Sequence, residues 1–434
     1  MGFFRSLGAI FQPFDPMRLA RLRSRWSELP ELLRTPHQTI GRTFVACGAT
    51  HGVHEACNFG CTACYLGQRA NQQKPKAFEE VRQQLEAMRA YLGPGGNVQI
   101  TSGEVTLLPQ ESLVKIIATA RKLDLSPMVM THGDTLRKDP AYLDALVTEG
   151  GLTKISIHID TTQRGRTGYG RVDDEAQLAP LRKEMADLLS ASYKRTGRKL
   201  KAATTVTVNQ GNLTQIPVIL ESFFENLKNF RILSFQPQAE TGRTKDGKGV
   251  TALEVWDKIE NWFGKSINPH MLQFGHQACN RTALLLVIET GKEPIVLQVA
   301  DPGNSTDATL IARFVKDFQG IVFNDRPWHE IAARVFGVVL RNPSWILRGS
   351  VYGVQRSWRE RKYWGAVLRA VLTGKIRLRP CVLVVHAFMD REELTTEEGK
   401  ERLKACMFKV PLNGEMVSMC EMNGTDLRES TYVV

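Results

Sequence analysis

The sequence predicts an α/β protein in which a parallel sheet is followed by an α-rich C-terminal domain. Short segments of alternating or β-branched residues recur between about residues 43 and 243, and segments with helical spacing of apolar residues separate them. Beyond this region, long basic segments with helical spacing are common. Strands that are separated by helices of this length imply parallel pairing, because a parallel connection requires a crossover.

The elements follow one another in a regular order. The first helix is expected over residues 77–92, where Phe78, Val81, Leu85 and Met88 lie on one side. The other elements are strands from residue 97 and at 127–131, 154–160, 203–209 and 229–237, and helices at 113–123, 141–147 and before residue 203. A doubly wound nucleotide-binding sheet is the alternative, but no G-x-G-x-x-G follows the first strand.

Composition sets the domain organisation. With 434 residues, of which 42% are hydrophobic, the chain can bury two cores. The Gly- and Lys-rich stretch from Thr241 to Gly249 is typical of a junction. We therefore expect an amphipathic or helical N-terminal extension at 1–42, the α/β unit at 43–245 and a C-terminal domain at 246–434.

The sequence favours a cytoplasmic protein. It contains no run of 18 apolar residues, and Met1 to Phe11 lacks the apolar segment and cleavage site of a signal peptide, although its apolar residues would suit an amphipathic turn. Eight cysteines without a secretory signal indicate metal or redox use in a reducing compartment rather than a disulfide framework.

The most informative motif is His54-Glu-Ala-Cys-Asn-Phe-Gly-Cys-Thr-Ala-Cys-Tyr65, which spaces Cys57, Cys61 and Cys64 as C-x3-C-x2-C. A closed zinc or iron–sulfur site needs four protein ligands, whereas three thiolates on a [4Fe–4S] cluster leave one iron open to a substrate. A zinc site that takes His51 or His54 as its fourth ligand, or three unrelated buried thiols, are the alternatives.

This spacing resembles the signature of the radical S-adenosylmethionine (radical SAM) superfamily. Ser102-Gly103-Glu104 follows the next strand and is similar to the family's Gly-Gly-Glu-like tripeptide, with Ser102 in place of the first glycine and Val105 where proline is common. The resemblance implies that Cys57, Cys61 and Cys64 bind the catalytic cluster and that Glu104 binds the ammonium group of SAM. It also implies a partial (β/α)6, TIM-like barrel. Tyr65 takes the packing role of an aromatic residue that many members carry where this chain has Ala63.

Polar side chains at strand ends extend the expected cofactor site. Ser156, His158 and Asp160 alternate along one strand and therefore point to one side of it. Thr205, Thr207 and Asn209 do the same on the next strand. In barrels of parallel strands the chemistry lies at the carboxyl ends, so these groups are expected to bind SAM ribose or a substrate hydroxyl, or to be satisfied core residues.

Two basic, glycine-containing loops follow these strand ends. The first carries Arg164, Arg166 and Arg171, and the second carries Arg243. Arginine binds phosphate through two donors, and glycine allows close backbone approach, so both loops are candidates for a substrate phosphate. A solvated loop without a ligand is the alternative.

Four of the other five cysteines lie late in the chain: Cys279, Cys381, Cys406 and Cys420. Four is the number that ligates one auxiliary [4Fe–4S] cluster completely, although buried free cysteines also serve as small apolar residues. Cys47 has no evident partner.

The positive charge is concentrated in one segment. Residues 331–380 contain eleven Lys and Arg against a single acid, Glu360, so that they hold +10 of the formal net charge of +12. Trp328, Trp345, Trp358 and Trp364 lie in or beside this segment. Basic amphipathic helices with tryptophan are typical of a surface that lies in an anionic bilayer interface. RNA binding and a solvated helical face are the alternatives.

Three segments are similar to the branch of radical SAM proteins that includes the archaeal tetraether lipid synthases: Gly103 to Leu107, Ile157 to Asp160 and Cys406 to Asn423. The chain lacks the additional N-terminal cysteines of those synthases. The resemblance implies hydrogen abstraction from an unactivated C–H bond of a lipid, by a protein peripheral to the inner face of the membrane, with a flavodoxin- or ferredoxin-type electron donor. Peptide or RNA modification, and a non-catalytic iron–sulfur scaffold, are the alternatives.

Overall fold

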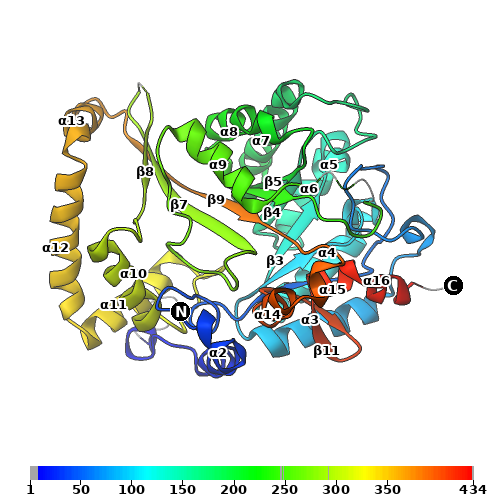
Figure 1. Cartoon of the computed structure of the whole chain (residues 1–434), viewed down its shortest axis with the longest axis horizontal. Coiled ribbons are helices and arrows are strands. Elements are labelled where there is room, and N and C mark those ends of the chain that lie inside the picture. The colour runs from blue at the N-terminus through cyan, green and yellow to red at the C-terminus, as the bar shows by residue number, and fades with distance from the viewer. Residues whose placement is uncertain (1–7, 245–246, 248, 292, 433–434) are drawn as a thin grey trace.

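One large, mostly parallel sheet organises the chain, which the computed structural model describes over residues 8–244, 247, 249–291 and 293–432 (Figure 1). Within these residues the sheet has the order β11-β10-β1-β2-β3-β4-β5-β6-β9-β7-β8. The strands are β1 (Cys47–Ala49), β2 (Gly96–Ile100), β3 (Leu125–Thr131), β4 (Lys154–His158), β5 (Lys201–Val208), β6 (Phe230–Pro237), β7 (Asn280–Glu289), β8 (Ile295–Gln298), β9 (Arg377–His386), β10 (Phe408–Leu412) and β11 (Glu415–Ser418). Neighbours from β1 to β6 pair in parallel, which confirms the predicted fold class.

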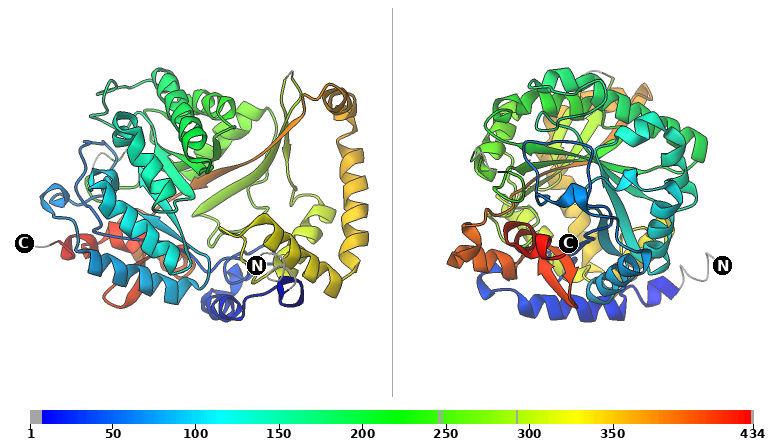
Figure 2. Two further views of the ribbon diagram at one scale, coloured as in Figure 1. Left: turned by 180° about the vertical axis from the view of Figure 1, so that it is seen from behind. Right: turned by 90° about the vertical axis from the view of Figure 1, so that its right-hand side faces the viewer.

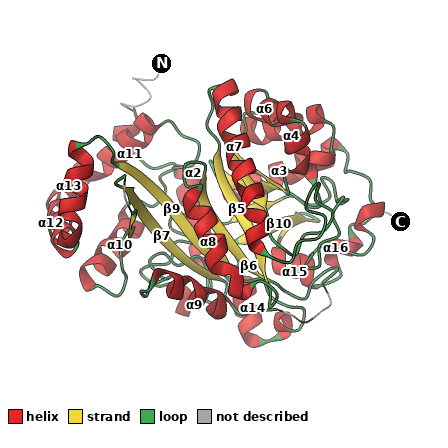
Figure 3. Ribbon diagram, turned by 90° about the horizontal axis from the view of Figure 1, so that it is seen from above, coloured by secondary structure: helices red, strands yellow, loops and turns green. Residues whose placement is uncertain are grey.

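Helices connect the parallel strands and flank the sheet (Figures 1 and 3). They are α2 (Pro16–Glu28), α3 (Phe78–Leu92), α4 (Gln110–Lys122), α5 (Asp134–Lys138), α6 (Pro140–Thr148), α7 (Ala179–Thr196), α8 (Ile216–Glu225), α9 (Ala252–Phe263), α10 (Ser305–Asp317), α11 (Trp328–Arg341), α12 (Ser344–Arg359), α13 (Trp364–Leu372), α14 (Glu397–Lys404), α15 (Met419–Gly424) and α16 (Leu427–Ser430). No helix of the described part is long and apolar enough to cross a bilayer.

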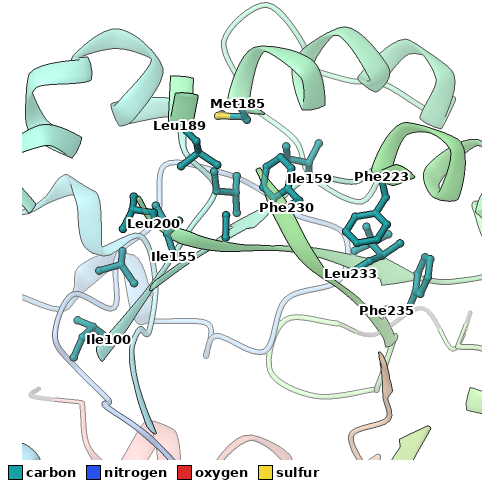
Figure 4. Packing of buried hydrophobic residues seen from close by; sticks show 14 of the residues in the cluster. Ile100, Ile155, Ile159, Met185, Leu189, Leu200, Phe223, Phe230, Leu233 and Phe235 are labelled. Carbon is teal, nitrogen blue, oxygen red and sulfur yellow. The ribbon is translucent and has the colours of Figure 1, made fainter. Parts of the chain in front are cut away.

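The main core lies between the sheet and the helices that connect its strands. Figure 4 shows Ile155 of β4 and Leu233 of β6 on the sheet, close to Leu189 of α7 and Phe223 of α8. Ile155 and Leu233 are fully buried, as expected for strands that are covered by helices. Apolar residues recur along these strands because their side chains pack against the helices that cover the sheet.

The part of the chain after residue 245 extends the same sheet at both of its edges. At one edge, β9 pairs in parallel with β6, and β7 and β8 follow in antiparallel pairing. At the other edge, β10 pairs in parallel with β1 and antiparallel with β11. The sheet thus continues across the boundary that composition suggests, and the division at residue 245 stays a prediction.

The N-terminal extension is attached to the sheet by a buried arginine. Asp15 caps α2 by accepting a hydrogen bond from the backbone N–H of Arg18. The Arg18 guanidinium donates to the carbonyl oxygens of Pro94, at 3.0 Å, and Thr43, at 2.7 Å. Burial lowers the pKa of Arg18 to about 10. The expected amphipathic turn near the N-terminus falls partly on residues 1–7, which lie outside the described residues.

A core substitution on β9 tests whether the C-terminal strands are part of the main fold. Leu383 is fully buried between β6 and β7, so Leu383→Ala should lower the free energy of unfolding by about 2–5 kcal/mol. Ile232→Ala on the neighbouring strand β6 is the control, because Ile232 is 38% exposed, and it should cost clearly less. Urea unfolding followed by tryptophan fluorescence measures both, and an equal cost for the two variants would contradict this packing.

Candidate functional site

A cavity lies at the carboxyl ends of the parallel strands. It encloses about 1390 Å³, part of which is open to solvent. The residues that line it at the strand ends are Thr101, Ser102, Gly103 and Glu104 after β2, Thr131 and His132 at β3, Ser156 and His158 on β4, Thr205 and Thr207 on β5, and Gln236 to Ala239 at β6. This is the edge of a parallel sheet at which barrel chemistry is found.

The cysteine loop, residues 50–77 between β1 and α3, forms one wall of this cavity. Cys57, Cys61 and Cys64 all line it, together with Tyr65. Burial raises the pKa of the Cys57 thiol to about 12 and also raises the pKa of Cys61 and Cys64. The neighbouring thiols raise the pKa of Cys61 further, so the three sulfur atoms lie within electrostatic reach of one another.

The tripeptide Ser102-Gly103-Glu104 attaches the cysteine loop to the end of β2. The N–H of Gly103 donates to the carbonyl of His54 at 2.9 Å, and the N–H of Glu104 donates to the carbonyl of Ala56 at 3.0 Å. A Cβ atom on Gly103 would lie 2.2 Å from the carbonyl oxygen of Glu55. Only glycine therefore allows this approach. The structure thus gives Gly103 a role in placing the loop.

The Glu104 carboxylate is buried and joins the ends of β2 and β3. Its Oε1 accepts hydrogen bonds from the hydroxyls of Thr106 at 2.5 Å and Thr131 at 2.6 Å, and its Oε2 accepts from the N–H of His132 at 2.8 Å. The Nε2 atom of His132 lies 3.3 Å from the same Oε2. Burial lowers the pKa of His132, although Glu104 opposes this shift. Glu104 lines the cavity as expected, with most of its acceptor capacity already used.

The partly exposed His158 pairs with the buried Asp160 at the cavity. Nε2 of His158 lies 2.5 Å from Oδ2 of Asp160 and 3.1 Å from the hydroxyl of Thr207. The other carboxylate oxygen accepts from the N–H and hydroxyl of Thr162. Burial acts to raise the pKa of Asp160, but His158 and these hydrogen bonds hold it below its usual value. His158 reaches the cavity, and Asp160 orients it from behind.

The other predicted cofactor-binding residues divide into two groups. Ser156 lines the cavity, where its hydroxyl lies 2.9 Å from that of Thr205. Tyr65 also lines it and donates to the carbonyl of Ser102 at 2.5 Å. Asn209 is not a lining residue, but its amide donates to Gln238, which is one. Most of the polar residues that were expected at the carboxyl ends of the strands therefore lie at this cavity. Their roles in binding SAM stay predictions.

The four arginines proposed for a substrate phosphate are not among the lining residues. Arg166 is buried and donates to the carbonyls of His132 and His158. Arg164 donates to loop carbonyls and to Asp173, which also accepts from the exposed Arg171. Arg243 donates to the carbonyl of Gly67 at 3.0 Å. These contacts brace loops, and a phosphate-binding role for the four stays a prediction without geometric support.

The late cysteines do not meet at one point. Cys279 accepts a hydrogen bond from Arg402 at 3.3 Å, and electrostatic effects link it with Cys406 and Cys420. Cys381 instead lies in the main core, opposite Leu285 in the β7–β9 ladder. Cys279 lies opposite Ala387, to which it is joined by a backbone hydrogen bond. Ala387 is six residues along the chain from Cys381, and six residues of extended strand span about 20 Å. In this arrangement Cys381 cannot share a cluster with the other three, which corrects the expected four-cysteine set.

A buried ion pair fixes the cysteine loop to the C-terminal helix. The Arg428 guanidinium of α16 lies 3.0 Å from Oε1 of Glu55, and both side chains are less than 5% exposed. Arg428 also donates to Asn423, and its guanidinium lies 5.0 Å from the centre of the Tyr65 ring. The Glu55 carboxylate in turn accepts from the N–H of Gly52 at 2.8 Å. Figure 2, right, shows the loop in blue across the mouth of the sheet, with the red C-terminal helices beside it.

The loop after β6 braces the cysteine loop from the opposite direction. The N–H of Arg243 donates to the carbonyl of Cys64 at 2.9 Å, and the Thr244 hydroxyl accepts from the N–H of Cys64 at 2.7 Å. Gly242 has φ +57°, and a Cβ there would lie 2.3 Å from the carbonyl of Tyr65. Gly242, one of the glycines that suggested a junction here, therefore allows a close backbone contact with the cysteine loop.

Sequence reasoning missed several of these groups. His132 could have been found from the sequence, because it is a polar residue directly after the expected strand at 127–131. Glu55 and Arg428 gave no local signal, because their pairing joins residues that are 373 positions apart.

Three thiols that line one cavity are a donor set that fits a [4Fe–4S] cluster. Within the described residues, no three His, Cys, Asp or Glu side chains are gathered closely enough to enclose one ion. A [4Fe–4S] cluster places each thiolate on a different iron, so its ligands stand farther apart than those of one ion. Three cysteines on one loop line one cavity, as such a cluster would need. Burial raises the pKa of Cys64, and the backbone N–H of Leu66, together with Arg243 and Arg428, opposes this shift.

Comparison with known proteins gives one family match and several partial likenesses. Residues 53–223 match the family model described as the radical SAM superfamily. The chain is also similar to the 7,8-dihydro-6-hydroxymethylpterin dimethyltransferase of Methanocaldococcus jannaschii, at 24% identity over 196 residues, which are 45% of this chain. The aligned part spans 37% of that relative's length.

Comparison with solved structures gives three partial matches. They are anSMEcpe with bound AdoMet (TM-score 0.37, 15% identity, 50% of this chain and 59% of that one), Streptococcus suis SuiB bound to S-adenosylmethionine (0.35, 16%, 50% and 46%) and the FeFe-hydrogenase maturase HydG from Carboxydothermus hydrogenoformans (0.36, 9%, 82% and 85%).

Adding a methyl group to Gly103 tests its close approach to the cysteine loop. Gly103→Ala should separate the loop from β2, so that iron bound per chain after anaerobic reconstitution falls by more than half. Gly60→Ala in the same loop is the control, because a Cβ there would meet nothing within 4 Å. Equal iron content in the two variants would show that the approach does not position the ligands.

Removing one partner of the buried ion pair tests the C-terminal clamp. Arg428→Met leaves the Glu55 carboxylate without its cation and should lower the free energy of unfolding by about 3–5 kcal/mol. The double variant Glu55→Gln, Arg428→Met should be more stable than Arg428→Met alone, because it no longer buries an unpaired charge. Chemical denaturation measures both, and additive losses would argue against the pairing.

Proposed function

Because the chain belongs to the radical SAM superfamily of enzymes, as its sequence predicts, we propose that it cleaves S-adenosylmethionine reductively at the cavity described above. The observation that carries this proposal is the meeting of three features in one cavity. The thiols of Cys57, Cys61 and Cys64, the Ser102-Gly103-Glu104 turn and the polar ends of β4 and β5 all line it.

Cys57, Cys61 and Cys64 would hold a [4Fe–4S] cluster, which leaves one iron without a protein ligand. The chemistry that such a cluster would supply is the transfer of one electron to SAM, which would break the sulfonium S–C5′ bond, release methionine and leave a 5′-deoxyadenosyl radical that can take hydrogen from a C–H bond. The protein's part is to orient the reactants and exclude water. Proposed partners include an electron donor of the flavodoxin or ferredoxin type, because the reduction requires an external electron.

Particular residues would place SAM beside the three thiols. The Glu104 carboxylate is held in place by Thr106, Thr131 and His132, so it can present fixed negative charge to an ammonium group. Ser156 and His158 lie on the next strand end, within the same cavity, and offer hydrogen-bonding groups to ribose hydroxyls. Tyr65 closes the cavity next to Cys64.

The substrate we propose is apolar, in the class of a lipid chain. Four apolar side chains of the C-terminal segment line the cavity: Phe388, Met389, Phe408 and Met419. Methionine and phenylalanine exclude water, and the flexible thioethers adapt to an irregular apolar ligand. These side chains would contact an apolar chain directly and would exclude water from the carbon that reacts.

A pterin-like substrate is the second candidate. It is favoured by the partial similarity to a pterin dimethyltransferase and by the four glutamines that line the cavity, which are Gln99, Gln163, Gln236 and Gln238. Side-chain amides offer both donors and acceptors to the edge of a heterocycle.

We do not extend the proposal to an auxiliary cluster, since Cys381 lies about 20 Å along the sheet from the level of Cys279.

Removing the three thiols tests the proposed cleavage. The variant in which Cys57, Cys61 and Cys64 are all replaced by Ala should produce no 5′-deoxyadenosine from SAM with dithionite under anaerobic conditions. Cys381→Ala is the control, because it removes a thiol that lies in the main core and does not line the cavity, and it should retain cleavage. Product formation by a folded triple variant would refute the assignment of the cluster to these cysteines.

A further inference from the structure

Helix α12 presents its apolar side to solvent. Leu347, Val351, Val354 and Trp358 follow one another at intervals of four, three and four residues, which places them on one face of the helix. Their exposed fractions are 70%, 46%, 71% and 62%, and no residue of α12 is buried. A helix on a soluble domain normally turns such a stripe toward the core.

The polar side of α12 faces the protein instead. Arg356 and Arg359 both pair with Asp307 of α10, whose carboxylate is fully buried. Tyr352 donates to the carbonyl of Val299 at 3.2 Å, and Nε1 of Trp345 donates to Asp317 at 3.0 Å. These contacts fix the helix in its orientation. The outward stripe is therefore a built feature of the fold, and Trp345 is not part of it.

Helices α11 and α13 lie with α12 at one end of the molecule (Figures 1 and 3), and they also expose apolar residues. We call the exposed apolar residues of the three helices the α11–α13 face. Its members are Trp328, Phe336 and Leu340 on α11, Ile346, Leu347, Val351, Val354 and Trp358 on α12, and Trp364, Leu368, Val371 and Leu372 on α13. So large an exposed apolar set indicates a surface that something else covers.

Exposed cations lie on the same helices and in the segments next to them. They are Arg341, Arg348, Arg361, Lys362, Arg369, Lys375 and Arg377, and no ion pair is found for any of them within the described part of the chain. The two acids of these helices, Glu330 and Glu360, are paired with Arg334 and Arg356. The Arg361 guanidinium lies 5.4 Å from the centre of the Trp358 ring. The charge that complements this surface is negative.

We propose that the α11–α13 face binds the surface of an anionic lipid bilayer. The aliphatic side chains would enter the region between headgroups and acyl chains, the tryptophans would lie at the level of the headgroups, and the unpaired cations would meet lipid phosphates. RNA would match the charge but would leave the aliphatic stripe uncovered. A second copy of this chain would bring the same cations together.

This inference goes beyond the proposed reaction and does not depend on it. No residue of the α11–α13 face lines the cavity. Helices α12 and α13 lie at the end of the molecule where β7 and β8 form the edge of the sheet. Helices α15 and α16 lie at the opposite end of the molecule in Figure 1. The face therefore holds the enzyme at a membrane rather than contacting the reacting atoms.

Vesicle flotation with the full-length protein tests the proposal. Vesicles of phosphatidylcholine with phosphatidylglycerol should carry the protein, and vesicles of phosphatidylcholine alone should carry much less, because each cation near an anionic surface contributes about 1 kcal/mol. Leu347→Asp should reduce binding roughly tenfold, since it places a carboxylate in the apolar stripe. Leu253→Asp is the matched control: Leu253 is a 52% exposed leucine on α9, and its replacement should leave binding unchanged.

Three results would overturn the proposal: no preference for anionic vesicles, equal binding by Leu347→Asp and Leu253→Asp, or a wild-type dimer that Leu347→Asp dissociates. Tight RNA binding without flotation would also overturn it. The triple cysteine variant should float like the wild type, so that a failure of membrane binding and a failure of SAM cleavage are separate outcomes.

Discussion

The contact of Gly103 with the backbone of Glu55 and Ala56 is the constraint on which the candidate site depends. It brings the end of β2 against a loop that has little regular structure of its own, and two backbone hydrogen bonds hold the loop there. Within the loop, Leu66 and Ala70 form a small apolar cluster against which Cys57, Cys64 and Tyr65 pack, and Tyr432 from the C-terminal end completes it. Contacts with neighbouring segments then position the loop. The Glu55–Arg428 ion pair fixes one side of it, and Thr244 and Gly242 fix the other. The three thiols are therefore placed by β2, by the loop after β6 and by the C-terminal helix together.

The C-terminal segment has more functions than its composition indicates. It supplies the strands at both edges of the sheet, the partner of Glu55 and the apolar wall of the cavity. A boundary drawn where the alternation of strands and helices ends misses these contacts, because β10 pairs with β1 across more than 350 residues of sequence. Burial of an ion pair costs desolvation energy, so the Glu55–Arg428 pair fixes geometry more than it adds stability.

Local periodicity carried most of the fold prediction. The expected strands at 127–131 and 203–209 correspond to β3 (Leu125–Thr131) and, except for residue 209, to β5 (Lys201–Val208). The cysteine spacing and the tripeptide after β2 are also local signals. The three cysteines and the three residues of the tripeptide all line the cavity. The contacts of a side chain with residues far away in the sequence could not be predicted from local patterns. The arginines of the basic loops looked suited to phosphate, but Arg166 and Arg243 donate to nearby carbonyls. The late cysteines looked like a set, but only the register of β7 with β9 shows that Cys381 lies apart.

The central claim is that three cysteines on a braced loop leave one iron of a cluster open to SAM. Electron paramagnetic resonance of the anaerobically reconstituted, dithionite-reduced protein tests this most directly. A reduced four-iron cluster should give a signal whose g-values change when SAM is added, because SAM would take the open coordination position. A signal that SAM leaves unchanged, or that persists in the variant without Cys57, Cys61 and Cys64, would contradict the account.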